Sequence, residues 1–169
     1  MSELEIIRQQ KDAFFEQSPH SPLTTEQKNS FKGLNYFPKN EALDLTLGVE
    51  EFDDPQSVQI QTNTGDVQTY DRYARFKFEV EGQAAELTIF RNQNGYFLPF
   101  VDSQAGDETY GAGRYLEPVE LADGRFRIDF NQAYNPYCAY NPMWSCPLTP
   151  AENRLQVPIR AGEKVFDEH

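Results

Sequence analysis

The fold is decided by residues 70–101, which read YDRYARFKFEVEGQAAELTIFRNQNGYFLPFV. Residues 70–81 are predicted to form one long strand, and apolar and polar residues alternate from Ala74 to Val80, a period of two that is typical of a strand with one buried face. That face is expected to hold Tyr70, Arg72, Ala74, Phe76, Phe78 and Val80. Turn residues at 81–82 and 92–95 then separate two further apolar segments, 84–91 and 96–101. The pattern predicts three antiparallel strands joined by tight turns.

More alternating segments lie on both sides of this meander. We expect further strands over residues 42–47, 58–62, 114–121, 125–130 and 154–159. In the last of these, Leu155, Val157 and Ile159 would share one face. Roughly eight strands with short turns favour a mainly β fold, either an antiparallel barrel or a sandwich.

Two short helices are expected before the strands. The first covers residues 2–16, where Ser2 and Glu5 have the spacing of a capping box, and the second covers residues 25–32, where Thr24 and Gln27 repeat that spacing. One side of the first helix carries Leu4, Ile7, Lys11, Phe14 and Phe15. Because no Gly- or Ser-rich linker follows, residues 1–169 are expected to form one domain, with a helical segment at 1–33 and a β domain at 42–169.

Composition narrows the classes of function. The chain has 169 residues and a net charge of −12, without a run of Lys or Arg, so nucleic acid is an unfavourable partner. Aromatic residues make up 14% of the chain, which predicts a core built largely on rings. The sequence contains neither an apolar run of about 18 residues nor a signal-peptide pattern, so we expect no membrane partner and a cytoplasmic location.

The second half of the chain carries the features that could form a site. Ala133-Tyr134-Asn135-Pro136 recurs six residues later as Ala139-Tyr140-Asn141-Pro142. Each Asn-Pro pair favours a turn, so the two copies predict a rigid loop that displays Tyr134 and Tyr140 in similar ways. Such a loop either closes the end of a barrel or holds side chains against a ligand.

The two cysteines, Cys138 and Cys146, are eight positions apart and are expected to be thiols. This spacing is not that of a CxxC redox or zinc site, and a chain with only two His residues lacks zinc ligands. An inert pair is one interpretation, and a nucleophilic Cys138 is the other, although the only internal His, His20, is distant in sequence. We expect no metal site, since Asp102, Asp107 and Glu108 do not match a calcium loop.

Charged and amide side chains in the second half allow two further interpretations. Arg114, Arg154 and Arg160 could form ion pairs that attach the last strand to the rest of the fold, or they could bind an anion. In the second case the expected ligand-binding residues are Arg114, Asn131, Tyr134, Asn135, Tyr140, Asn141, Arg154 and Arg160.

Several longer motifs resemble a known family. They are PFVD at 99–102, ETYGAGRYL at 108–116, DFN at 129–131, AYNPYCAY at 133–140, CPL at 146–148, ENRL at 152–155 and IRAGEK at 159–164. Together with SPL at 21–23 and FKGL at 31–34, they are similar to the prokaryotic family catalogued as domain of unknown function 1684. The resemblance extends over nearly the whole chain and implies a single domain, but it implies no activity, cofactor or residue role.

Three hypotheses of function remain. The first is binding of a small polar or anionic ligand in a pocket formed by the rigid second half. The second is a structural or protein-interaction module without a pocket, with an exposed aromatic patch around Tyr36 and Phe37. The third is an enzyme in the same pocket, with Asp129, Glu163 or Cys138 as the reactive group. The sequence indicates neither a cofactor nor an oligomeric state.

Overall fold

The computed structural model describes residues 2–54 and 56–166, in which two α-helices precede nine strands. The helices are α1 (Glu3–Gln17) and α2 (Thr25–Ser30). The strands are β1 (Asp44–Leu47), β2 (Glu50–Glu51), β3 (Ser57–Gln61), β4 (Val67–Val80), β5 (Gln83–Asn92), β6 (Gly95–Phe100), β7 (Arg114–Leu116), β8 (Val119–Glu120) and β9 (Phe126–Asp129). Four 3₁₀ turns complete the regular structure, namely η1 (Glu41–Leu43), η2 (Phe130–Gln132), η3 (Tyr137–Ala139) and η4 (Ala151–Asn153).

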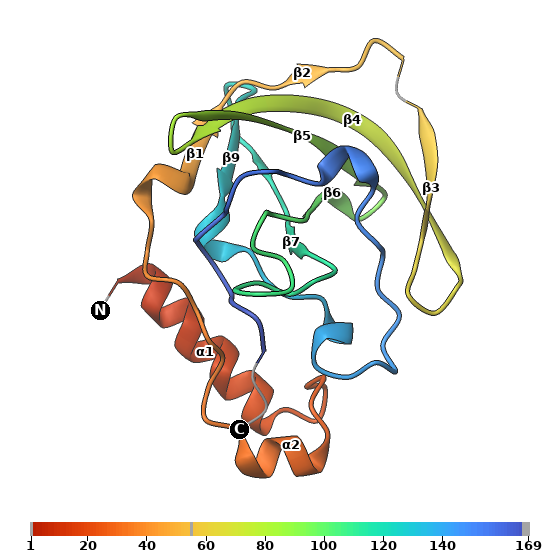
Figure 1. The fold of residues 1–169 in the computed structure, drawn as a ribbon. Helices are drawn as coiled ribbons and strands as arrows, with labels where there is room; N and C mark the ends of the chain where they lie inside the picture. The colour runs from red at the N-terminus through yellow and green to blue at the C-terminus, as the bar shows by residue number, and fades with distance from the viewer. Residues whose placement is uncertain (1, 55, 167–169) are drawn as a thin grey trace.

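The strands form two antiparallel sheets. The larger has the order β2-β4-β5-β6-β7, with β3 also paired to β4, and the smaller has the order β1-β9-β8. The long pair β4 and β5 arches over one end of the molecule, and α1 and α2 lie together at the other end (Figure 1). The mainly β prediction is confirmed. Within the described ranges the sheets do not close into a barrel, so the sandwich alternative fits better.

The main core lies between the two sheets and is built on aromatic rings, as the composition predicts. Phe130 belongs to this core and is fully buried. Its ring stacks on Phe78 at a centroid distance of 5.5 Å and meets Phe100 edge-on at 5.2 Å. These contacts join β4 and β6 to the end of β9, so aromatic packing holds the two sheets together.

A β-bulge corrects the predicted face of β4. Arg72 pairs with Phe90 of β5, but Ala74 pairs with Ile89, so Tyr73 is an extra residue in the strand. The bulge reverses the alternation. Tyr70 therefore packs in a separate cluster with Ile60 and Phe90, whereas Phe76, Phe78 and Val80 face the main core. The prediction of one continuous face from Tyr70 to Val80 is wrong at this point.

Both helices begin where their capping residues predict. The Ser2 hydroxyl accepts a hydrogen bond from the backbone N–H of Glu5 at 3.2 Å, and Thr24 forms a reciprocal capping box with Gln27. Helix α1 buries Phe15 against Tyr140, with ring centroids 4.9 Å apart. In the described part of the chain, no helix is long and apolar enough to cross a membrane.

The predicted strand over residues 154–159 does not form. Instead, this segment runs beside residues 101–103 and makes irregular hydrogen bonds, such as Leu155 N–H to the Val101 carbonyl at 2.7 Å. Pro158 lacks an N–H group, and the N–H of Ile159 donates to the Asp102 carboxylate at 2.7 Å rather than to a strand partner. The side chains still follow the expected pattern, because Val157 and Ile159 lie in the main core and Leu155 packs against it.

Gly113 lies so close to Phe100 that a substitution tests the packing between them. Its φ is +102°, and a Cβ atom there would lie 2.5 Å from the Phe100 carbonyl oxygen. We expect Gly113→Ala to lower the free energy of unfolding by about 2–4 kcal/mol, the sum of the left-handed backbone penalty and overpacking. Denaturant unfolding measures the effect.

Gly124→Ala is the matched control, since Gly124 has φ +88° and no atom within 4 Å of the added Cβ. Gly124→Ala should lower the free energy of unfolding only by the left-handed backbone penalty, about 1–2 kcal/mol. Equal losses in the two variants would show that the close approach of Gly113 to Phe100 does not matter.

Candidate functional site

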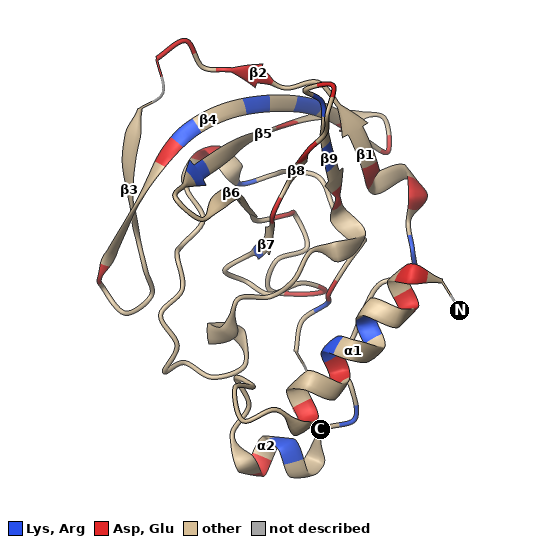
Figure 2. Ribbon diagram, turned by 180° about the vertical axis from the view of Figure 1, so that it is seen from behind, with Lys and Arg blue, Asp and Glu red and all other residues tan. Residues whose placement is uncertain are grey.

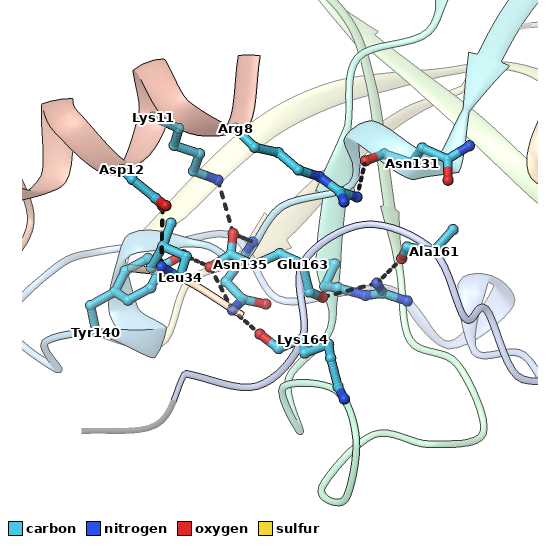
Figure 3. Close-up of polar contacts among 11 residues, drawn as sticks. Arg8, Lys11, Asp12, Leu34, Asn131, Asn135, Tyr140, Ala161, Glu163 and Lys164 are labelled. Carbon is cyan, nitrogen blue, oxygen red and sulfur yellow. Dashed lines mark hydrogen bonds and ion pairs between the residues drawn. The ribbon is translucent and has the colours of Figure 1, made fainter. Parts of the chain in front are cut away.

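Glu163 is a fully buried carboxylate at the junction of the helices and the sheets. Lys11 of α1 contacts its Oε1 at 2.9 Å, and the backbone N–H of Asn135 donates to the same oxygen at 3.1 Å. The side-chain amide of Asn135 donates to Oε2 at 3.1 Å, and the Tyr140 hydroxyl also donates to Oε2. Figure 3 shows Lys11 pointing from the helix toward this cluster. Four donors thus compensate the buried charge.

Arg114 is a fully buried cation bound to the same C-terminal segment. Its Nη1 donates to the carbonyl oxygens of Ala161 at 2.5 Å and Glu163 at 3.0 Å, and its Nη2 donates to that of Ile159 at 2.8 Å. The Asp102 carboxylate lies 3.8 Å from Nη2. Burial lowers the pKa of Arg114 to about 10, and the nearby carboxylates of Asp102 and Glu163 oppose that shift. The guanidinium therefore stays charged at neutral pH.

The three predicted anion-binding arginines are not brought together. Arg114 is buried and uses its donors on backbone carbonyls, whereas Arg154 is exposed. Arg160 is also exposed and pairs with Glu108 at 3.0 Å. Their positions favour the first of the two interpretations for Arg114, an interaction that attaches the C-terminal segment. The prediction of ligand binding receives no support from the positions of these arginines.

The two copies of the Ala-Tyr-Asn-Pro repeat have different environments, so the expectation of similar display is wrong. Tyr134 is half-buried and donates to Glu117, whereas Tyr140 is 4% exposed and donates to Glu163. Asn135 is buried beside Glu163, but the Asn141 side chain only accepts the backbone N–H of Met143 at 3.2 Å.

Asn131 and Asp129 have structural contacts. Asn131 exchanges two hydrogen bonds with the backbone of Asn40, at 2.8 and 2.9 Å. Asp129 caps η2 by accepting the N–H of Asn131 at 3.0 Å, and it also lies 3.5 Å from Arg127. Both residues therefore connect the end of β9 to neighbouring segments. In residues 2–54 and 56–166, no group of three or more His, Cys, Asp or Glu side chains could hold a metal ion.

A groove of about 360 Å³ lies between α1 and residues 131–137. Its apolar and aromatic lining comprises Leu4, Ile7, Phe14, Phe15, Tyr36, Ala133, Tyr134 and Tyr137. Ile7 and Phe14 are 37% and 39% exposed, which is high for side chains of this type. The charged residues of the described lining are two cations, Arg8 and Lys11.

Arg8 is incompletely paired within the protein. Its Nη1 and Nη2 donate to the carbonyls of Phe37 and Asn131 at 3.0 and 3.4 Å, and its guanidinium lies 4.4 Å from the centre of the Tyr36 ring. Burial lowers the pKa of Arg8, an effect opposed by Tyr36 and Asp129.

Three buried polar side-chain atoms of the described residues have no hydrogen-bond partner: Arg8 Nε, the Tyr36 hydroxyl and Asn135 Oδ1. All three residues line the groove. Unsatisfied buried groups are costly, and three of them are concentrated along this groove.

Sequence reasoning placed the pocket in the second half and missed the N-terminal contribution of Arg8, Lys11 and Tyr36. One signal was available, because Lys11 lies within an apolar stripe of the first helix. The expected exposed aromatic patch is wrong, since Phe37 is 6% exposed and Tyr36 is half-buried beside Arg8. Along α1 the two basic bands lie between acidic bands at both ends of the helix (Figure 2), so only the packing shows which charges reach the groove.

The fold and the groove define a small mainly β protein with a helix-covered pocket. The profile of the family described as protein of unknown function DUF1684 matches residues 29–164, so the chain belongs to that family and the resemblance is confirmed. A solution NMR structure of an uncharacterised protein from gene locus rrnAC0354 of Haloarcula marismortui is similar at a TM-score of 0.72. The two chains are 36% identical, over 98% of this chain and 94% of that one. No curated protein matches the chain.

Arg114 allows the structural interpretation to be tested. We expect Arg114→Met to lower the free energy of unfolding by about 3–5 kcal/mol, because three carbonyls and the buried Asp102 would lose their cation. Arg160→Met is the control, since its side chain is 44% exposed, and it should cost at most about 1 kcal/mol. Chemical denaturation gives both values, and equal small losses would exclude a structural role for Arg114.

Proposed function

We propose that the protein binds a small molecule with a flat apolar body and an anionic head group, such as a carboxylate, in the groove between α1 and residues 131–137. The observation that carries the proposal is the lining itself: apolar and aromatic walls surround Arg8 and Lys11, with no carboxylate among the described lining residues. Its volume of about 360 Å³ falls within the range of small-molecule sites.

Lys11 is positioned to meet the head group. Its ammonium has three N–H donors, of which one is directed at Glu163, and the side chain remains 25% exposed. The Tyr134 ring lies 5.2 Å from the nitrogen and limits its motion further. Because Glu163 fixes Lys11 before any ligand arrives, little conformational entropy would be lost on binding.

Arg8 supplies the second positive charge. It is held by backbone carbonyls rather than by a carboxylate, so its charge is not neutralised by direct pairing with an acidic side chain. An anion in the groove would interact with this half-buried guanidinium at reduced solvent screening.

Ile7 and Phe14 would bind the apolar body. Both lie on the exposed rim of α1, and covering them would remove apolar surface from water at about 25 cal/mol per Å². Tyr137 forms part of the facing wall, so a planar group would have apolar contacts on two sides.

We propose binding without a reaction step, because the two predicted acidic groups are committed elsewhere. The Glu163 carboxylate is 0% exposed and receives four hydrogen bonds. Asp129 caps η2 and lies beside Arg127. Neither carboxylate lines the groove.

The test uses 4-phenylbutyrate as a probe and its uncharged amide as a comparison, with ¹⁵N-labelled protein titrated in NMR. We expect shifts of backbone amides in α1 and residues 131–137, and binding of the acid at least about tenfold tighter than that of the amide. Ile7→Glu should weaken binding of the acid at least about tenfold, because it places a like charge at the rim of the groove.

Ile6→Glu is the matched control. Ile6 is the adjacent residue, is 44% exposed and does not line the groove, so the substitution changes net charge equally and should alter affinity less than about twofold. Equal affinity for acid and amide would contradict the anionic head group. Shifts that map away from α1 would contradict the groove as the site.

A further inference from the structure

Cys138 and Cys146 are the only cysteines of the chain, and the fold brings them into contact as free thiols. The backbone N–H of Cys138 donates to the Cys146 sulfur at 3.3 Å. This contact is intramolecular and short in sequence, so a bond between the sulfurs would close a loop over residues 139–145.

Cys146 is held from the opposite side by the β3–β4 hairpin. Its backbone N–H donates to the Asn63 side chain at 2.7 Å, and its carbonyl accepts the backbone N–H of Asn63 at 3.2 Å. Its side chain is 7% exposed. Cys146 is therefore a fixed and shielded thiol, unsuited to first attack by a dissolved reagent.

Cys138 is more exposed to solvent than Cys146. It is half-buried on η3, and the Tyr110 hydroxyl lies 3.7 Å from its sulfur. The hydrogen bond from the Cys146 thiol, supported by that from Tyr110, lowers the pKa of Cys138 to about 6, although burial acts against it. The same interaction raises the pKa of Cys146. This shift favours the thiolate of Cys138, which is the nucleophilic form of cysteine.

We propose that Cys138 and Cys146 form a peroxide-reactive dithiol site, in which Cys138 is the nucleophile and Cys146 the resolving thiol. The Cys138 thiolate attacks one oxygen of a hydroperoxide, an S–O bond forms and the O–O bond breaks, and the leaving oxygen takes a proton to become water or an alcohol. Cys138 becomes a sulfenic acid.

The second step completes the electron balance. The Cys146 sulfur attacks the Cys138 sulfur, the S–S bond forms, the S–O bond breaks, and the released hydroxide combines with the Cys146 proton as water. The hydroperoxide has then accepted two electrons from the two thiols. A dithiol reductant reverses the reaction by thiol–disulfide exchange.

An inert pair of thiols, the alternative interpretation, would need different surroundings. Buried inert thiols lie in apolar environments that raise the pKa of both. Here the Tyr110 hydroxyl lies 3.7 Å from the Cys138 sulfur, and the Cys146 sulfur accepts the backbone N–H of Cys138 at 3.3 Å. This arrangement combines a stabilised thiolate with an adjacent resolving thiol, as peroxide-sensitive sites require.

The first test treats the purified full-length protein with hydrogen peroxide at low molar excess. We expect both titratable thiols to disappear, the intact mass to fall by about 2 Da, and dithiothreitol to restore both. A gain of about 32 or 48 Da on a single cysteine, a disulfide-linked dimer, or two persistent thiols would each overturn the proposal.

Single substitutions assign the two roles. In Cys146→Ser the sulfenic acid on Cys138 cannot be resolved and should be trapped by dimedone, whereas Cys138→Ser should give at least about tenfold less adduct. Cys138→Ala and Cys146→Ala repeat the experiment, and circular dichroism confirms that each variant used is folded. Equal trapping in both variants would overturn the assignment of Cys138 as the nucleophile.

The pH dependence of alkylation gives a separate readout. The rate of reaction of Cys138 with iodoacetamide should reach half its maximum near pH 6, compared with about pH 8.5 for an unperturbed thiol. Tyr110→Phe removes one of the two donors and should move the midpoint upward. A midpoint of about 8.5 in the unmodified protein would show that Cys138 is not activated.

Discussion

Two buried, oppositely charged side chains determine the path of residues 159–164, and both α1 and the sheets depend on that path. Arg114 enters from β7 and binds three carbonyls of the segment, including that of Glu163. The Glu163 carboxylate turns the other way and receives Lys11 from α1. An uncompensated buried charge is costly, so neither Arg114 nor Glu163 can move away from its partners without a loss of stability. Gly162 fits the crowded passage, since its φ is +79° and a Cβ would lie 2.7 Å from the Phe130 carbonyl oxygen.

This constraint also shapes the groove. Lys11 is directed by Glu163, and the Asn135 amide is fixed by both Glu163 and the Lys164 carbonyl. The polar residues of the groove, Lys11 and Asn135, are therefore held by hydrogen bonds to buried groups of the protein, whereas Ile7 and Phe14 on the rim are exposed. In such a groove an incoming molecule would cover the exposed apolar side chains. The polar side chains that orient it would already be held in place, so little entropy would be lost in ordering them.

The sequence predicted the features that depend on neighbours along the chain. Ser2 and Thr24 cap their helices within three residues, and Gly124 makes the hairpin before β9 with a local hydrogen bond between Leu121 and Arg125. The features that the sequence did not predict involve residues that are far apart along the chain. Lys11 and Glu163 are 152 positions apart, and strict alternation cannot show that Tyr73 is an extra residue relative to β5. The contact between Cys138 and Tyr110 likewise joins residues 28 positions apart, so the spacing of the cysteines alone did not reveal it.

The two copies of the Ala-Tyr-Asn-Pro repeat hold the short segment that contains η3. Asn135 and Tyr140, one from each copy, converge on Glu163 and anchor both ends of the short segment that contains η3. Between them, Tyr137 lines the groove and meets Phe15 edge-on at 6.3 Å, and Cys138 is the next residue. Tyr137 and Cys138 thus belong to one 3₁₀ turn. The proposed ligand groove and the proposed dithiol site therefore share η3, whose two ends are both held by Glu163.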